Sequence, residues 1–198
     1  MTVRALRPAE TDAAAHLAAR AFHDDPLFRH LYPNPVRRPR QLATEFRAAI
    51  RWVYRPVGVA DVTDGVDGLA LWEPPGMTLS GWRQAALAAS LLRAAGPRRV
   101  VPILRDYDAF DALRPTEPHG HLGLLAVAPE QQGRGIGSQL VRRGLERARR
   151  DGVPVNLETG SLQNVAFYSH LGFRELHRIS LPSGSPTHWG LWWTPARD

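Results

Sequence analysis

Residues 124–138 decide the fold, and they read Leu124-Leu125-Ala126-Val127-Ala128-Pro129-Glu130-Gln131-Gln132-Gly133-Arg134-Gly135-Ile136-Gly137-Ser138. An apolar run ends at Pro129, a glycine-rich turn follows, and a helical pattern begins at Gly135. We therefore predict a strand over 119–127 and a helix over 135–150. Glycines let backbone N–H groups approach a ligand, and a helix N-terminus carries partial positive charge. The segment predicts a cradle for an anion such as a pyrophosphate.

The helix after the turn is amphipathic. Its apolar stripe consists of Ile136, Leu140, Val141, Leu145 and Ala148. Such spacing is typical of a helix that packs one face on a sheet. Arginines stand near its C-terminal end, at 147, 149 and 150, where positive charge interacts favourably with the negative pole of the helix dipole.

The glycine pattern excludes two nucleotide-binding motifs. The dinucleotide fingerprint needs a third glycine where Ser138 stands. A Walker loop needs a lysine, and the sequence contains none, so all of its 25 basic residues are arginines. A tight turn that binds nothing would give the same local pattern, and residue physics alone leaves both interpretations open.

Outward from this segment, strands alternate with helices. A β-α-β-α-β run of this kind predicts an α/β fold with at least one crossover unit. Predicted strands cover 2–6, 57–62, 66–73, 119–127, 153–158, 173–180 and 188–193, and predicted helices cover about 8–22, 38–54, 79–95, 98–113, 135–150 and 162–171. No long linker divides the chain, so we expect one domain over residues 1–198.

Composition limits the possible functions. The chain has no cysteine, which excludes disulfides, thiolate metal sites and a cysteine acyl-enzyme. Its net charge of +6 suits a polyanionic cofactor or nucleic acid, or reflects solvated arginines. The arginine clusters at 37–40 and 98–99 lack interleaved aromatics, so we expect no nucleic-acid partner. No apolar stretch reaches the length of a membrane span, and we expect a cytoplasmic protein without a membrane partner.

Three blocks of sequence resemble the GCN5-related N-acetyltransferase (GNAT) superfamily. Gln132-Gly133-Arg134-Gly135-Ile136-Gly137 resembles its Gln/Arg-x-x-Gly-x-Gly/Ala signature. The other blocks are Leu125-Ala126-Val127-x-Pro129 and Asn164-x-x-Phe167-Tyr168-x-x-x-Gly172-Phe173. Within the superfamily, the chain is similar to the puromycin N-acetyltransferase type through Ala21-Phe22-x-Asp24-Asp25-Pro26, Ala70-Leu71-Trp72, Glu117-Pro118 and Leu157-Glu158-Thr159.

This resemblance implies a fold and a co-substrate. The implied fold is a mixed, mostly antiparallel sheet of six to seven strands, flanked by helices and splayed between 119–127 and 153–158. It implies an acetyl-CoA-binding core over 117–178 and an acceptor-side helical insert over about 79–114. The implied CoA contacts are backbone groups of Leu125, Ala126 and Val127, the turn residues Gln132, Gly133, Arg134, Gly135, Ile136, Gly137 and Ser138, and the helix residues Asn164 and Tyr168.

The resemblance also implies catalytic roles. Tyr168 matches the family tyrosine that protonates the leaving thiolate, and a core tyrosine is the alternative interpretation. Glu158 ends a strand beside the motif and is the first candidate for the base. His121 is the second candidate, because strand alternation places it on the face of Gly123, Leu125 and Val127. His119 would share that face. The eight histidines do not cluster with carboxylates, so we expect no metal.

The acceptor side is less determined by sequence. Phe22, Asp24, Asp25, Trp52 and Trp72, together with Tyr54, lie in segments that wall the acceptor pocket in this family, and core packing is the alternative for both tryptophans. We expect acetyl transfer to a primary amine of a small molecule by direct attack in a ternary complex. Antibiotic or secondary-metabolite modification is the expected role, in a monomer or homodimer. The alternatives are a protein lysine or N-terminal acetyltransferase and a non-catalytic acyl-CoA-binding module.

Overall fold

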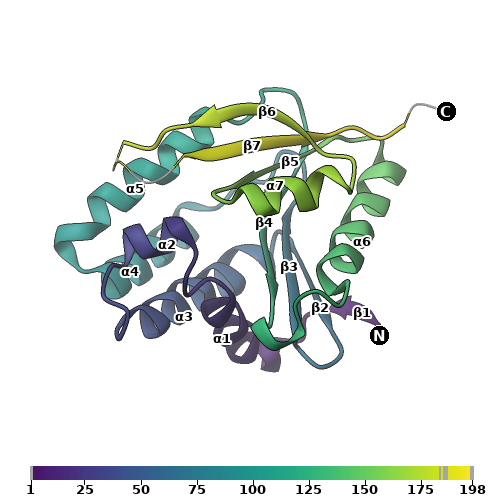
Figure 1. Ribbon diagram of the computed structural model, residues 1–198. Coiled ribbons are helices and arrows are strands. Elements are labelled where there is room, and N and C mark those ends of the chain that lie inside the picture. The colour runs from purple at the N-terminus through teal and green to yellow at the C-terminus, as the bar shows by residue number, and fades with distance from the viewer. Residues whose placement is uncertain (1, 183, 185–186, 197–198) are drawn as a thin grey trace.

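The computed structural model describes residues 2–182, 184 and 187–196. The turn expected over 182–186 therefore lies partly outside the described residues. A seven-stranded sheet organises the chain in the order β1-β2-β3-β4-β5-β7-β6, and only the β4–β5 pair is parallel (Figure 1). The strands are β1 (Val3–Ala5), β2 (Val59–Thr63), β3 (Gly68–Glu73), β4 (Gly120–Val127), β5 (Val155–Thr159), β6 (Arg174–Ile179) and β7 (His188–Trp193). The predicted mixed, mostly antiparallel fold is confirmed.

Helices flank both faces of the sheet. Those on one face are α1 (Thr11–Ala21), α2 (Pro26–Leu31), α3 (Arg38–Ala49) with the π-helix η2 (Ile50–Tyr54), α4 (Gly81–Ala95) and α5 (Pro97–Ala112). Those on the other face are α6 (Ile136–Asp151) and α7 (Leu162–Ser169), and short 3-10 turns occur at η1 (Pro8–Glu10) and η3 (Pro129–Gln131). The expected single helix over 38–54 thus changes to π geometry for its last turn.

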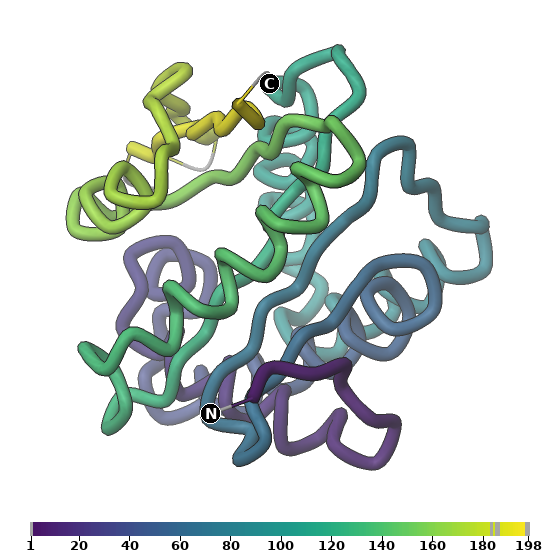
Figure 2. The backbone as a smooth tube through the Cα atoms, turned by 90° about the vertical axis from the view of Figure 1, so that its right-hand side faces the viewer, coloured from purple at the N-terminus to yellow at the C-terminus, as the bar shows by residue number. Residues whose placement is uncertain are grey.

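Two hydrophobic clusters mark the two faces. In Figure 1, α6 lies to the right of strands β2–β4, and α1, α3 and α4 lie to their left. Viewed from that right-hand side, α6 crosses in front of the strands (Figure 2). Leu69, Leu71 and Leu124 pack with α1 and α3, whereas Ala70 and Trp72 pack with α6 and α7. We call these the α3 face and the α6 face.

The sheet opens between its two parallel strands. Strands β4 and β5 pair only at Gly120 with Val155 and at His121 with Asn156. Beyond His121, β4 has no partner on that edge within the described residues, so its backbone N–H and C=O groups remain available to a ligand. The splay implied by the family resemblance is therefore present, and it lies beside Glu158 on β5.

Helix α2 was not predicted from sequence. Asp25 caps it, since its carboxylate accepts hydrogen bonds from the backbone N–H groups of Leu27 at 2.9 Å and Phe28 at 3.3 Å. Pro26 occupies the first helical position, where a missing N–H group costs nothing. The pair Asp25-Pro26 is therefore a helix start, whereas the predicted helices left residues 23–37 without a helix.

Close packing of α6 on β3 depends on the absence of a side chain at Gly144. A Cβ atom added there would lie 2.0 Å from Cζ2 of Trp72, which is 6% exposed in the core. The indole of Trp72 thus occupies the space that a larger residue would need.

We expect Gly144→Ala to lower the free energy of unfolding by about 1–3 kcal/mol, because helix and strand must separate to admit the methyl group. Urea unfolding followed by circular dichroism measures this change. Gly81→Ala is the control, since no atom lies within 4 Å of a Cβ added at Gly81. Equal unfolding midpoints for the two variants would contradict the packing argument.

Candidate active site

A β-bulge at Gly123 decides which way His121 points. Leu71 pairs with Leu124 and Trp72 pairs with Leu122, so β4 inserts one extra residue opposite β3. The bulge reverses the alternation of side chains along β4. His121 therefore lies on the α3 face and not on the face of Leu125 and Val127, and our expectation from simple alternation was wrong.

His121 and Glu158 form a buried pair across the opening. Nε2 of His121 lies 3.4 Å from Oε2 of Glu158, and His121 is 4% exposed. Nδ1 of His121 lies 3.1 Å from Oδ1 of Asn156, whose Nδ2 donates to the carbonyl of Leu191 at 3.3 Å. That second bond orients the Asn156 amide, so Nδ1 of His121 carries a proton. The other ring nitrogen, Nε2, is thereby directed at the Glu158 carboxylate across the β4–β5 opening.

A second polar group lies next to this pair, and sequence reasoning did not identify it. Glu73, at the end of β3, accepts a hydrogen bond from the Tyr54 hydroxyl at 3.1 Å and one from Nη1 of Arg114 at 2.9 Å. Burial acts to raise the pKa of Glu73, but the charges of His121 and Arg114 and these hydrogen bonds outweigh it and lower the pKa. Glu73 thus stays ionised. An acid at the end of a predicted strand, just before Pro74, was the available signal.

Tyr54 also explains the glycine at the bulge. A Cβ atom added at Gly123 would lie 2.2 Å from the Tyr54 hydroxyl oxygen. Only glycine lets the phenol reach Glu73 across the bulged strand. Burial, followed by the charge of Glu73, raises the pKa of Tyr54 well above its usual value, so the hydroxyl remains a donor.

Tyr168 lies on the opposite face of the sheet. It is 7% exposed in the α6-face cluster, where its ring packs edge-to-face against Phe167 at 4.9 Å and Phe173 at 5.6 Å between centroids. Burial raises the pKa of the Tyr168 phenol, which keeps it protonated. The structure gives its hydroxyl no hydrogen-bond partner among the described residues. The candidate acid and the candidate base are therefore separated by the sheet and can meet only through the β4–β5 opening.

The glycine turn comes together with β4 and α7 at Gly137. A Cβ atom added at Gly137 would contact Phe167 at 3.4 Å, Leu125 at 3.6 Å and Val127 at 3.7 Å. The strand, the start of α6 and the more distant helix α7 thus meet on the α6 face.

The turn itself fits a pyrophosphate. Gly133 and Gly135 adopt φ values of +77° and +79°, and open space surrounds both. Gly135 begins α6 without a side-chain cap, so the first N–H groups of the helix, including that of Ser138, face outward unsatisfied. The exposed Arg134 projects from the same turn. These features suit CoA, whose phosphates would be held by the amides of residues 132–138.

Other predicted CoA contacts have structural partners. Gln132 donates from Nε2 to the Val127 carbonyl at 3.2 Å and so ties the turn to β4. Asn164 donates to Oγ1 of Thr159 at 3.2 Å and fixes the start of α7 at the end of β5. The Ala126 side chain and its neighbours at 124 and 128 pack on the α3 face, so only the backbone of Ala126 faces the opening.

The predicted acceptor residues divide into several groups. Phe22 joins Phe28 and Phe46 in an aromatic cluster with ring centroids 5.3–5.7 Å apart, on the α3 face. Asp24 is exposed and pairs with His23 at 3.1 Å. Asp25 caps α2, as described above. None of these contacts shows Asp24 or Asp25 among the polar groups around Glu158.

The two tryptophans lie apart from those polar groups. Trp72 packs beneath α6 on the opposite face, so its expected place in the acceptor wall was wrong and the core alternative is correct. Trp52 packs edge-to-face against Trp82, with ring centroids 5.6 Å apart. The guanidinium carbon of Arg51 lies 4.7 Å from the centroid of the Trp52 ring. His119 packs against Trp192 at 5.4 Å and is likewise absent from the His121 pair.

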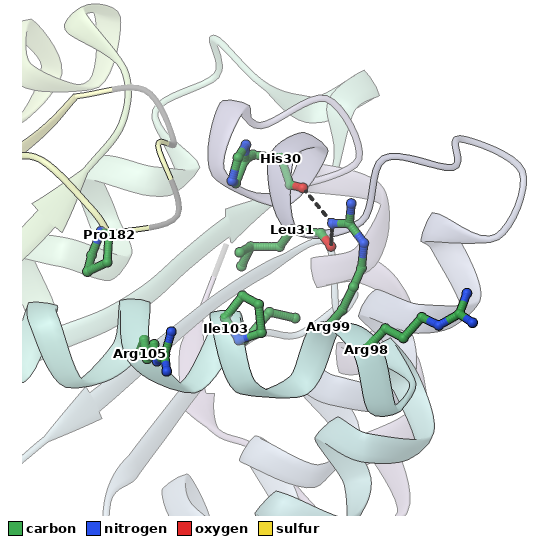
Figure 3. Close-up of a pocket in the computed structure, with 8 residues that line it drawn as sticks. His30, Leu31, Arg98, Arg99, Ile103, Arg105 and Pro182 are labelled. Carbon is green, nitrogen blue, oxygen red and sulfur yellow. Dashed lines mark hydrogen bonds between the residues drawn. The ribbon is translucent and has the colours of Figure 1, made fainter.

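A pocket of about 520 Å³ opens elsewhere, between α2 and α5 (Figure 3). Arg99 reaches across it and donates to the carbonyls of His30 at 3.0 Å and Leu31 at 2.8 Å, which close the end of α2. Arg98 points outward in the same view. No predicted site residue lines this pocket, and its basic wall would repel an ammonium group. It is lined by His30, Leu31, Arg98, Arg99, Pro102, Ile103, Arg105 and Pro182.

Neither a metal-binding cluster nor a helix able to span a membrane occurs among the described residues. Across residues 2–182, 184 and 187–196, no group of three or more acidic or histidine side chains could hold a metal ion. In the same part of the chain, no helix has both the length and the apolar character that a bilayer crossing requires.

Known proteins resemble the chain in sequence and structure. A family model described as "Acetyltransferase (GNAT) family" matches residues 99–173. An uncharacterized N-acetyltransferase of Schizosaccharomyces pombe is 26% identical over 185 residues, covering 87% of this chain and 74% of the relative. A crystal structure described as "histone acetyltransferase HPA2 and related acetyltransferase" from Corynebacterium glutamicum matches with a TM-score of 0.75 and 25% identity, covering 100% of this chain and 97% of that one.

More distant structures share the fold. A polyamine N-acetyltransferase of Drosophila melanogaster matches with a TM-score of 0.64 at 16% identity, covering 98% of this chain and 99% of that one. The fold of this chain is similar to that of these acetyltransferases. The family model and the relatives support a GNAT-type acetyltransferase, for which acetyl-CoA would be the co-substrate. A particular closeness to the puromycin type is not confirmed.

Proposed function

We propose that this chain transfers the acetyl group of acetyl-CoA to a primary amine of a small molecule by direct attack. One observation carries the proposal: a protonated phenol, Tyr168, lies on one face of the sheet, the His121–Glu158 pair lies on the other, and the β4–β5 opening lies between them. The CoA cradle is on the Tyr168 face. The acceptor would therefore approach from the α3 face.

The proposed acetyl transfer needs a base for the amine proton and an acid for the departing sulfur. When bound, acetyl-CoA supplies a thioester carbon that an amine nitrogen attacks, so that a C–N bond forms and the C–S bond breaks. Glu158, paired with His121, takes the proton that the amine nitrogen loses. Tyr168 gives its hydroxyl proton to the departing sulfur and is reprotonated from solvent. No cysteine exists to carry an acyl-enzyme, and direct transfer needs none.

The polar groups on the α3 face favour a cationic acceptor. Glu73 and Glu158 are both partly buried there, with side chains 17% and 13% exposed. Carboxylates enclosed in this way attract an ammonium group and lower the cost of removing it from water. The long helical insert of α4 and α5 adds mass on this face, which suits an enclosed site better than an open groove for protein substrates.

A protein amine is the second candidate acceptor. The structure that matches with 25% identity carries the description of a histone acetyltransferase, and this observation alone favours a lysine side chain. A non-catalytic acyl-CoA-binding module is disfavoured, because it would have no use for the buried His121–Glu158 pair. Modification of an antibiotic or other secondary metabolite is our proposal for the role of the small-molecule activity.

The test is release of free CoA thiol from acetyl-CoA across a panel of amines. The panel contains aminonucleosides, aminoglycosides, alkyl mono- and diamines, aryl amines and lysine peptides. CoA binding is measured in parallel by calorimetry. Turnover on small amines supports the proposal, and turnover confined to peptides replaces it with the protein alternative. CoA binding without turnover on any amine would favour the binding module, and absence of CoA binding would overturn the proposal.

A further inference from the structure

Glu45 on α3 lies between two tyrosine hydroxyls. Tyr32 donates to Oε2 of Glu45 at 2.5 Å, and Tyr107 on α5 donates to Oε1. Each carboxylate oxygen can accept more than one hydrogen bond, so both keep capacity for a further donor. Burial raises the pKa of the Glu45 carboxyl, and the two phenols oppose that rise.

Glu45 differs from two other enclosed carboxylates, Glu73 and Asp61, each of which pairs with arginine. Glu73 pairs with Arg114, and the buried Asp61 pairs with Arg143 at 3.1 Å and Arg147 at 2.6 Å. No arginine or histidine forms an ion pair with Glu45 in the part of the chain that the structure describes. Charges enclosed in a protein are normally paired with an opposite charge, and the described residues provide none for Glu45. Glu45 nevertheless keeps accessible surface, as does Tyr107.

Glu45 lies on the acceptor side of the sheet and is connected to the candidate base. Burial, then the charge of Glu45, raises the pKa of Tyr107 well above its usual value, and the nearby Tyr32 and Tyr54 add to the rise. Tyr32, Tyr54 and Tyr107 belong to one hydrophobic cluster, and α3 continues directly into η2, which carries Tyr54. Tyr54 in turn donates to Glu73, beside the His121–Glu158 pair. Glu45 and Tyr54 thus lie on one continuous helical segment, on the face of the sheet that carries the candidate base.

We propose that Glu45 determines acceptor specificity by binding a second positively charged group of the acceptor, distal to the amine that is acetylated. The preferred acceptors would then be diamines. One amine reaches Glu158, and the other, as an ammonium, donates to the remaining lone pairs of Glu45 beside the half-buried ring of Tyr107. This inference rests on the proposed function, but its binding step can be measured without turnover.

The binding test is thermal unfolding of the full chain without acetyl-CoA. A ligand that binds only the folded state raises the Tm. We expect α,ω-diaminoalkanes to raise the Tm more than 1-aminoalkanes of equal length. Glu45→Gln should abolish that difference, and Asp108→Asn, which removes one exposed charge from α5 next to Tyr107, should preserve it. Equal shifts from diamines and monoamines in the wild type would overturn the inference.

The activity test compares kcat/KM for each diamine with that for the matched monoamine. We expect Glu45→Gln to lower this ratio about 10-fold or more. Glu45→Asp keeps the charge but draws it back by one methylene, so the best diamine should become one methylene longer. Should Glu45→Gln fail to fold, an unchanged length optimum in Glu45→Asp would overturn the inference.

The two proposals fail in different ways. An unchanged diamine-to-monoamine ratio in Glu45→Gln, with amine acetylation intact in the wild type, would overturn the role of Glu45 and leave the proposed function standing. A diamine-specific rise in Tm that Glu45→Gln loses, without CoA release from any amine, would support the binding role and overturn the proposed function.

Discussion

Replacing Tyr168 with phenylalanine is expected to lower kcat about 100-fold or more while CoA affinity stays nearly unchanged. A positioned acid contributes about 10²–10⁴-fold to a rate, and a phenylalanine preserves the packing of the ring but donates no proton. The packing against Phe167 and Phe173 does not involve the hydroxyl. Steady-state thiol release measures kcat, and calorimetry measures CoA binding.

The pH dependence sharpens this prediction. Because burial raises the pKa of Tyr168, the phenol stays protonated through neutral and mildly alkaline pH, and wild-type kcat should show no loss from its ionisation below about pH 10. Ser169→Ala is the matched control on the same helix, since it removes an exposed hydroxyl bonded only to the Val165 carbonyl. A Tyr168→Phe enzyme as fast as the Ser169→Ala control would disprove the acid role.

Replacing Glu158 with glutamine is expected to lower kcat/KM about 100-fold at neutral pH. Alkyl amines are mostly protonated there, with a pKa near 10.4, so they depend on a base to release the proton. The deficit should shrink as the pH rises toward that value, because solution then supplies the free amine. A purely structural role would give a deficit that does not change with pH.

Two further variants complete this experiment. Glu175→Gln, on the exposed strand β6, removes an equal charge that pairs with Arg178, and it should leave the profile unchanged. His121→Gln tests whether the histidine is the base itself. If it shows the larger pH-dependent loss and Glu158→Gln does not, the roles within the pair are exchanged.

Short-range patterns predicted the strand and helix on either side of the glycine turn well. The strand, glycine turn and helix of residues 119–150 are contiguous, and each forms for a local reason: apolar strand character, positive φ at Gly133 and Gly135, and a 3.6-residue apolar period. The structure places β4 at Gly120–Val127 and α6 at Ile136–Asp151, within one residue of expectation at each end. Helix α2 was missed although its cap, the pair Asp25-Pro26, is also local.

The acceptor side could not be predicted in the same way, because its geometry depends on pairing between distant segments. The alternation rule assigns His121 to one face, yet the register against β3 inserts Gly123 and reverses it. A glycine inside a strand pattern is a local sign of a bulge, but it does not show which residues of the neighbouring strand lie opposite. Glu73 gains Arg114 and Tyr54 from segments 41 and 19 residues away.

The sequence by itself determined the class of fold and the glycine turn that begins α6, because both come from residues that are neighbours along the chain. The candidate acid, Tyr168, came from the family resemblance and stays a prediction. Tertiary structure alone decided which face carries His121 and Glu158, removed Trp72 from the acceptor wall, and enclosed Glu45 between Tyr32 and Tyr107. Those outcomes depend on strand register and on side chains from separate helices meeting in space, and the energy of such contacts exists only once the chain has folded.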